Sequence, residues 1–166
     1  MKRVGVISDT HGRLPRCAYT ELADCDYIIH AGDICSPGIY EELKTIASPI
    51  AVLGNNDIAE YGGSVQCYAQ AYIEGFSFLV AHYKEDVISY LRNLKSQGKD
   101  LPQICINGHT HIPIIRQGSH EFSDQLFICP GSTTRPRGGF RPCVIKMEIE
   151  QGIYIKPPYF VWLDWF

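Results

Sequence analysis

The chain has 166 residues, of which 45% are hydrophobic and 20% charged, and this length is ordinary for one domain. The composition excludes a collagen, a coiled coil and a disordered tail as overall classes. The formal net charge of −3 gives no global positive field to hold a nucleic-acid backbone, so we expect any phosphate chemistry to be local.

Cysteine usage and the N-terminus indicate the compartment. The 7 cysteines are an odd number, and no two stand close enough for a CxxC redox pair or a zinc finger. So many free thiols are typical of a reducing compartment. The apolar run Val4–Ile7 is too short for a signal-peptide core, and no apolar run long enough to span a membrane follows. We therefore expect a cytoplasmic protein without a membrane partner.

Short apolar runs near the start of the chain predict buried strands, because polar residues and glycine follow each run at once. Helices are expected between them, one after Pro15 and one with Ser36 as its cap. The order strand–helix–strand–helix–strand predicts parallel strands. The expected strands are Val4–Ile7, Tyr27–Ile29 and Ile50–Leu53, and the first helix is expected over Leu14–Ala23.

The rest of the chain predicts a hairpin, one helix and further strands that pair antiparallel. Gly75 is the expected hairpin turn, and Gly98 ends a helix over Glu85–Gln97 that has an apolar face. The strands are expected at Tyr68–Glu74, Phe76–Ala81, Ile104–Asn107, Ile112–Gln117, Leu126–Cys129, Val144–Ile149 and Ile153–Lys156.

No linker, repeat or low-complexity run divides the chain, so we predict one α/β domain over residues 1–166, with two packed mixed sheets and helices outside. Pro157 and Pro158 are expected to end the last strand. The tail at 159–166 that follows is almost entirely large and apolar. An exposed patch of this kind usually marks an interface, so we expect a homo-oligomer with its contact through the tail. The alternative is a tail that packs back over its own sheet.

Polar clusters follow the predicted strands at their carboxyl ends, where binding crevices of open α/β sheets lie. Asp9 and His11 stand two apart, as do His109 and His111, so each pair presents ligand atoms to one side of an extended segment. The clusters are Asp9-Thr10-His11-Gly12, Gly32-Asp33, Gly54-Asn55-Asn56-Asp57, His82 and Gly108-His109-Thr110-His111.

These clusters supply carboxylate, imidazole and amide oxygen but no thiolate. Such a set suits Mn, Fe, Ni or Zn better than Ca, and it argues against a structural zinc site. The ligands are too many for one ion, whereas two ions that share a carboxylate would use them all and would clamp a phosphoryl group. The clusters thus predict two divalent ions per chain, with manganese the first choice.

The order DxH, GD, GNxD, H, GHxH resembles the calcineurin-like metallophosphoesterase superfamily, and the short chain with Pro130, Gly131 and Ser132 downstream is similar to its small YfcE-type phosphodiesterase branch. The resemblance implies a four-layer αββα sandwich and a dimer or tetramer. It also implies how the ligands divide: Asp9, His11 and His111 for the first metal, Asn55, His82 and His109 for the second, and Asp33 bridging both.

The function implied is hydrolysis of small phosphodiesters, rather than of proteins or long nucleic acids, by in-line attack of a metal-bound hydroxide. Asn55 and Asn56 are the expected catalytic positions. The superfamily commonly has His at the position of Asn56, where it stabilises the transition state or protonates the leaving group. Esters with acidic leaving groups, such as aryl diesters, should therefore react best. The alternative is a non-catalytic metal-binding scaffold or protein-interaction module on the same fold, as the related retromer subunit is thought to be.

Two further departures from the family pattern affect the rim of the site: Tyr83 follows His82 in place of the usual Gly, and Cys129 replaces the Asn often found before Pro-Gly-Ser. The segment 130–142 carries three arginines and no acid. A guanidinium group can donate two parallel hydrogen bonds to the oxygens of one phosphate. Arg137 is the expected substrate contact, because the sequence Pro136-Arg137 is similar to the branch's downstream loop. A solvated loop is the alternative. His30, His120 and Asp57 are expected to lie outside the ligand set and outside catalysis.

Overall fold

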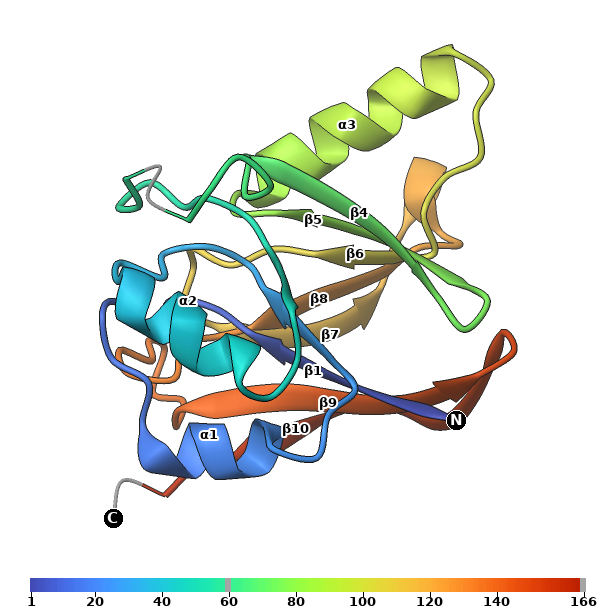
Figure 1. Cartoon of the computed structure of the whole chain (residues 1–166). Helices are drawn as coiled ribbons and strands as arrows, with labels where there is room; N and C mark the ends of the chain where they lie inside the picture. The colour runs from blue at the N-terminus through green and yellow to red at the C-terminus, as the bar shows by residue number, and fades with distance from the viewer. Residues whose placement is uncertain (59–60, 165–166) are drawn as a thin grey trace.

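Two five-stranded sheets pack face to face, and helices cover their outer faces (Figure 1). The computed structural model describes residues 1–58 and 61–164. The elements are β1 (Lys2–Ile7), α1 (Arg16–Leu22), β2 (Tyr27–His30), α2 (Pro37–Lys44), β3 (Pro49–Ala51), β4 (Tyr68–Ile73), β5 (Phe76–Ala81), α3 (Lys84–Ser96), β6 (Ile104–Ile106), β7 (Pro113–Gln117), the 3-10 helix η1 (His120–Phe122), β8 (Leu126–Pro130), β9 (Cys143–Glu150) and β10 (Ile153–Trp162).

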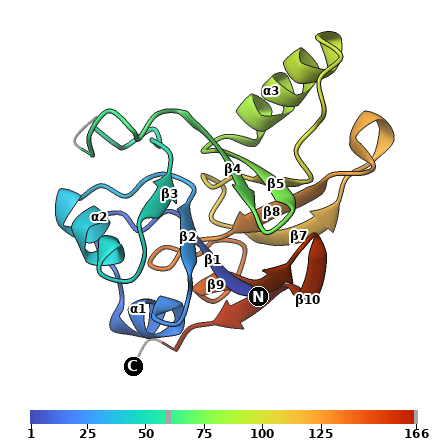
Figure 2. The same cartoon turned by 45° about the vertical axis from the view of Figure 1, so that its right-hand side comes forward.

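The first sheet has the strand order β10-β9-β1-β2-β3, with α1 and α2 on its outer face (Figures 1 and 2). Strands β1, β2 and β3 are parallel, which confirms the prediction for the start of the chain. Ser36 stands at the cap position of α2, but its side chain makes no capping hydrogen bond there. The expected cap therefore exists by position only.

The second sheet has the order β4-β5-β6-β8-β7, and α3 covers its outer face (Figure 1). The hairpin of β4 and β5 is antiparallel as expected. The prediction that the later strands all pair antiparallel is wrong, because β6 is parallel to both β5 and β8. Strand β6 follows β5 through α3, and a helical crossover joins parallel neighbours. The α/β fold of two packed mixed sheets flanked by helices, a four-layer αββα sandwich, is confirmed.

Strand β10 is longer than the sequence predicts. It continues past Pro157 and Pro158 to Trp162, and its pairing with β9 is irregular between Lys156 and Tyr159. Prolines are tolerated there because β10 is an edge strand and the irregular stretch needs no regular ladder of hydrogen bonds. The expected end at Lys156 is therefore wrong.

The first half of the expected tail is thus part of this strand. Tyr159 to Trp162 pair with β9, and Leu163, which follows them, is buried. The last two tail residues, 165 and 166, lie outside the described part of the chain.

Alternation along the strands divides the core into layers. Val4 and Val6 belong to the apolar cluster between the two sheets, together with Phe78 of β5. Their neighbour Ile7 contributes instead to the cluster under the helices, with Leu22 of α1. Among the described residues, no helix is long and apolar enough to cross a membrane. The packing of the sheets brings the ends of strands from both to one end of the sandwich.

Candidate metal centre

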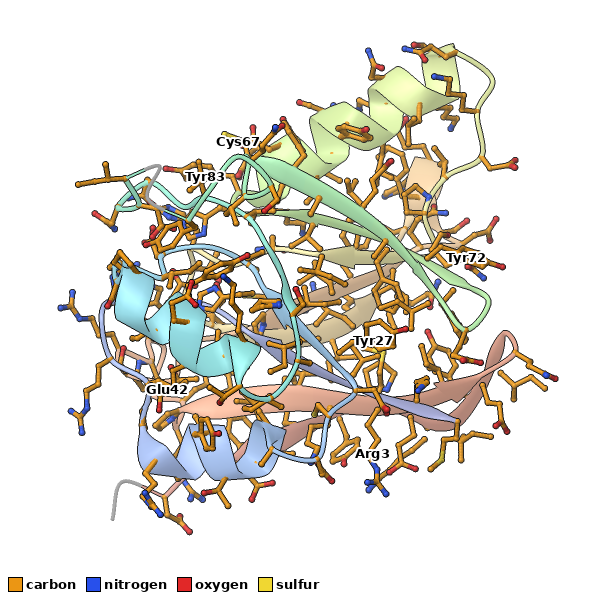
Figure 3. The ribbon with its side chains drawn as sticks, viewed as in Figure 1. Arg3, Tyr27, Glu42, Cys67, Tyr72 and Tyr83 are labelled. Carbon is orange, nitrogen blue, oxygen red and sulfur yellow. The ribbon has the colours of Figure 1, made fainter. Side chains whose placement is uncertain are left out.

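The predicted ligands gather at one end of the two sheets. Figure 3 marks this end by Tyr83, which follows His82, and the opposite end by Tyr72 of the β4–β5 hairpin. The backbone turns sharply there: φ is 53° at Asp9, 55° at Asp33 and 67° at His109. Such angles are uncommon for residues with side chains and cluster at functional sites. His11 and His111 share the same feature.

The first group joins the β1 end to the segment before β7. Asp9 Oδ1 lies 3.2 Å from His111 Nε2 and 3.8 Å from His11 Nε2, and the two imidazole nitrogens are 3.1 Å apart. These three residues offer ligand atoms close enough to hold one ion. They are the three that the family resemblance assigns to the first metal.

The second group lies beside the first. Asp33 Oδ2 is 3.6 Å from His82 Nε2 and 3.7 Å from His11 Nε2, so it faces histidines of both groups. Asn55 Oδ1 lies 3.0 Å from His82 Nε2 and 3.2 Å from His109 Nδ1. All seven predicted ligands therefore form one continuous cluster. Asp9 also approaches His82, at 4.0 Å, and both carboxylates are thus within reach of both groups.

Hydrogen bonds outside the cluster set the direction of two imidazoles. His82 Nδ1 is 2.7 Å from the Ala31 carbonyl, and His111 Nδ1 is 2.6 Å from the Arg135 carbonyl. A carbonyl only accepts, so each Nδ1 carries the proton. In the neutral rings, Nε2 therefore directs a lone pair into the cluster, as metal-ligating histidines do.

The oxygens of Asp9 behave in opposite ways. Oδ2 accepts from the Ser8 hydroxyl at 2.5 Å and from the His109 amide at 3.0 Å. Oδ1 is buried and accepts no hydrogen bond from any described residue. A buried unpaired carboxylate oxygen is costly unless it is paired or binds a metal. The donor set thus fits a divalent cation, because a ring of lone pairs surrounds the free oxygen.

The pKa shifts are consistent with a cation site. Burial acts to raise the pKa of Asp9, but the adjacent His111 imidazole and the hydrogen bond from Ser8 outweigh it and lower the pKa. Burial lowers the pKa of His11, which favours the neutral, ligating imidazole. The pKa of His111 is raised, chiefly by the Asp9 carboxylate that lies beside its Nε2. A proton and a metal ion would therefore compete for the same nitrogen of His111.

Three glycines leave room for these ligands. A Cβ on Gly54 would lie 2.1 Å from Asp33 Oδ1, and one on Gly32 would lie 2.6 Å from His82 Nδ1. A Cβ on Gly108 would lie 2.0 Å from Ser8 Oγ and 2.8 Å from Asp9 Oδ2. These three glycines are needed because a ligand side chain, or Ser8 in the case of Gly108, occupies the space that a Cβ would fill.

The side chain of Asn56 turns toward the cluster. Its Nδ2 donates to Asp33 Oδ2 at 2.8 Å, and its backbone amide donates to Asp33 Oδ1 at the same distance. Asp57 accepts from the amides of Gly54 and Cys35 and from the Tyr61 hydroxyl. Asp57 therefore orders the loop, as the sequence reading allows, and Asn56 holds the carboxylate of Asp33.

The arginine-bearing segment passes beside the first group. The Arg137 amide donates to the His111 carbonyl at 3.1 Å, which brings the backbone of this segment to the ligands. The Arg137 side chain is exposed, and so is that of Arg135. Nearby, the Ser132 and Thr134 hydroxyls donate to the Asp9 carbonyl.

The sequence analysis missed the residues that support the ligands. Ser8 holds Asp9 from one side, and Ser132 and Thr134 hold its backbone from the other. Ser8 could have been found, since it directly precedes the DxH motif. Thr134 belongs to a polar stretch that has no distinctive spacing.

Two histidines stand apart from the cluster, as expected. His30 is buried, its Nε2 lies 3.1 Å from the Thr10 hydroxyl, and its Nδ1 accepts from the Gly32 amide. Burial lowers the pKa of His30 to about 4. His120 begins η1, on the surface of the second sheet.

Comparison with known proteins gives a consistent result. Residues 1–152 match the calcineurin-like phosphoesterase superfamily domain. A probable metallophosphoesterase of Methanothermobacter thermautotrophicus is 36% identical over 140 residues, which cover 81% of this chain and 78% of the relative.

Solved structures share the fold. An archaeal phosphodiesterase is 24% identical and superposes with a TM-score of 0.74 over 96% of this chain and 99% of its own. YfcE, a phosphoesterase from E. coli, is 20% identical with a TM-score of 0.65 and covers 98% of this chain and 100% of its own. Vps29 of Entamoeba histolytica in complex with Zn²⁺ is also 20% identical, with a TM-score of 0.68 over 95% of this chain and 98% of its own. At these identities the structural likeness concerns the fold.

Proposed function

The chain belongs to the calcineurin-like phosphoesterase superfamily, and we propose that it is a dinuclear metal-dependent phosphodiesterase of small phosphodiesters, of the small YfcE type. The observation that carries the proposal is the buried, unpaired Asp9 Oδ1 amid inward-facing imidazole nitrogens. A cluster built only for stability would pair that oxygen with a donor.

The residues that would hold the two ions are those of the cluster. Asp9, His11 and His111 would hold the first, and Asn55, His82 and His109 the second, with Asp33 shared. We propose manganese as the metal, with iron, nickel or zinc as alternatives. When bound, the ions would supply charge stabilisation for the phosphate and a nucleophile at neutral pH.

The protein itself contributes orientation. Carbonyl partners fix the rings of His82 and His111, and Ser8 with the His109 amide fixes Asp9. Because these ligand side chains are already oriented, they need not reorient during the reaction, and no free energy is lost in that step. No side chain of the cluster is needed as a covalent nucleophile.

The substrate class follows from Asn56. Its carboxamide is a weak acid, and its Nδ2 is engaged with Asp33. Protonation of a poor leaving group is therefore weakly supported, and acidic leaving groups should react best. We propose Arg137 as a phosphate contact, because its guanidinium is exposed on a segment whose backbone adjoins His111.

The second candidate is a metal-binding scaffold without turnover. The observation that favours it is again Asn56, which occupies the position where the superfamily commonly has His and is turned toward Asp33. The Zn²⁺ complex of Vps29 belongs to a protein of the same fold. An activity screen separates the two candidates.

The test is turnover by the manganese-reconstituted protein with bis(4-nitrophenyl) phosphate, 4-nitrophenyl phosphate and 2′,3′-cyclic nucleotides. The aryl diester should be the fastest of the three. Asp33→Asn should abolish the activity, whereas Asp100→Asn, which makes the same change at an exposed carboxylate away from the cluster, should retain it. Metal binding without turnover on any of these esters would favour the scaffold.

A further inference from the structure

A cavity of about 180 Å³ lies on the outer face of the second sheet. It opens where α3 begins and extends to β7 and the 3-10 helix η1. Helix α3 makes its main contacts with β5 and β6, whereas β7 is the edge strand on the other side of β8. None of the seven predicted metal ligands lines this cavity.

The floor of the cavity is apolar and partly aromatic. Phe127 of β8 and Phe122 of η1 are both buried, and Ile88 and Ile114 complete the floor. Gly118 stands at its edge, where a Cβ would lie 2.0 Å from the Phe122 carbonyl oxygen and 2.9 Å from Phe127 Cε2. The chain therefore passes close to the Phe127 ring and to the Phe122 backbone, at a position that has no space for a side chain.

The mouth of the cavity is positively charged. Lys84 lies on the α3 side, with its Nζ 5.7 Å from the centre of the Phe127 ring, and Arg116 lies on the β7 side. Neither forms an ion pair with another described residue, and none of the residues that line the cavity is acidic. Glu121, a nearby carboxylate, is already paired with Arg92 at 2.9 Å. Two unpaired cations thus flank an aromatic floor.

We propose that this cavity is a second binding site, which takes a small aromatic anion. A dry cavity of about 150 Å³ is known to hold a benzene molecule, so a cavity of this size has room for one aromatic ring. The ring of the ligand would lie against Phe127 and Phe122, because aromatic pairs are more favourable than the burial of their apolar surface alone. The acidic group of the ligand would lie at the mouth, between Lys84 and Arg116. There the Arg116 guanidinium could donate two parallel hydrogen bonds to a carboxylate. The site is independent of the proposed phosphodiesterase activity.

The test is a calorimetric titration of the folded, manganese-loaded protein with 4-iodobenzoate, together with an NMR titration of the zinc-loaded protein, because paramagnetic Mn²⁺ would broaden the signals near the start of α3. We expect one saturable site, with chemical-shift changes confined to the start of α3, β7 and β8. Arg116→Gln and Lys84→Gln should each raise Kd by about tenfold, whereas Lys99→Gln, which removes an exposed charge outside the cavity, should leave Kd unchanged. Ser119→Trp keeps both cations but narrows the mouth, and it should also weaken binding.

Two further arms separate this site from the metal centre and from simple apolar adsorption. Asp33→Asn should bind 4-iodobenzoate as the parent protein does, and neutral 4-iodobenzyl alcohol should bind more weakly. Absence of saturable binding, an unchanged Kd in Arg116→Gln and Lys84→Gln, or loss of binding in Asp33→Asn would overturn the proposal. Circular dichroism checks that each variant remains folded.

Discussion

Asp9 and Asp33 differ in how their carboxylates are held. Asp9 has one oxygen saturated by Ser8 and the His109 amide and one left free. Asp33 accepts on both oxygens from Asn56, yet its Oδ2 also faces His11 and His82. At this scale, the identity of residue 56 decides both how firmly Asp33 is held and what proton donor lies beside the phosphate.

The first prediction concerns Asn56. Asn56→His should raise the rate with alkyl leaving groups relative to aryl ones, because imidazolium is a far better proton donor than a carboxamide. The measurement is kcat/KM for a series of phosphodiesters with leaving groups of increasing pKa. Asn56→Ala is the matched control, since it removes the bond to Asp33 without adding a donor. An equal dependence on leaving group in Asn56→His and Asn56→Ala would refute the role assigned to this position.

The second prediction concerns the packing of Gly108. Gly108→Ala would place a Cβ against Ser8 Oγ and Asp9 Oδ2, so we expect a loss of stability of about 1–3 kcal/mol and weaker metal binding. Gly63→Ala is the control, because no atom of the described residues, apart from its chain neighbours, lies within 4 Å of its Cβ position. Thermal unfolding and metal content measure both effects. A Gly108→Ala protein that keeps the metal content of Gly63→Ala would show that Asp9 does not depend on this contact.

At the scale of elements, β9 is joined to α1 by a nearly buried lysine. Lys146 Nζ donates to the Glu21 carbonyl at 2.7 Å and to Asp24 Oδ1 at 2.6 Å. The bond with Lys146 is the largest influence on Asp24 and lowers its pKa. Because the folded pKa is below the unfolded one, this pair stabilises the fold above the unfolded pKa of about 4, and the contribution is lost as pH falls through the folded value.

The third prediction follows from that sign. Asp24→Asn should cost about 1 kcal/mol or less at pH 7, since Asp24 is half exposed. The difference from the parent protein should shrink toward zero as pH falls below 4. Urea unfolding at several pH values measures it. A difference that persists unchanged at pH 3 would exclude the ion pair as its cause.

The sequence predicts where the helices and strands of this fold lie better than it predicts which strands pair and in which direction. Each strand that carries a ligand was visible as an apolar run followed by polar residues. The parallel pairing of β6 was missed because strand order depends on which faces pack, although the crossover through α3 could have indicated it. The extension of β10 was missed because two prolines usually end a strand, and only its edge position permits them.

The site shows the same division. The ligands were predictable because four of the five motifs have a glycine beside a donor at a strand end, and His82 also follows a strand end. The supporting hydroxyls of Ser132 and Thr134 were not, because a hydroxyl that holds a backbone carbonyl from across the fold has no spacing signal. Asn56 was noticed only as a departure from a family pattern, and its bond to Asp33 needed coordinates.

At the scale of the whole molecule, oligomerisation remains a prediction. The tail that suggested it packs as an edge strand on its own sheet, which is the alternative weighed from the sequence. An aromatic surface is still present, because Trp162 is 40% exposed and stacks with Phe140 at 6.3 Å. An exposed edge strand with stacked rings is a suitable contact for a second copy.

The fourth prediction is that the protein is a dimer or tetramer with Trp162 in the contact. Trp162→Lys should dissociate it, because a charge is costly in an interface core. Tyr72→Lys, at the opposite end of the molecule, is the control (Figure 3). Light scattering gives the mass of each. A monomeric parent protein, or an unchanged mass in Trp162→Lys, would contradict the expectation.

The central claim is that one chain binds two divalent ions in a cluster that shares carboxylates and uses them to hydrolyse a phosphodiester. The most direct measurement is the number of ions per chain, determined by elemental analysis while manganese is titrated into the protein. Aryl diesterase activity is recorded at each step of the titration. The account predicts two ions per chain, activity that rises with the second, and loss of most metal and all activity in Asp33→Asn. At most one ion per chain, with no gain in activity on adding manganese, would contradict it.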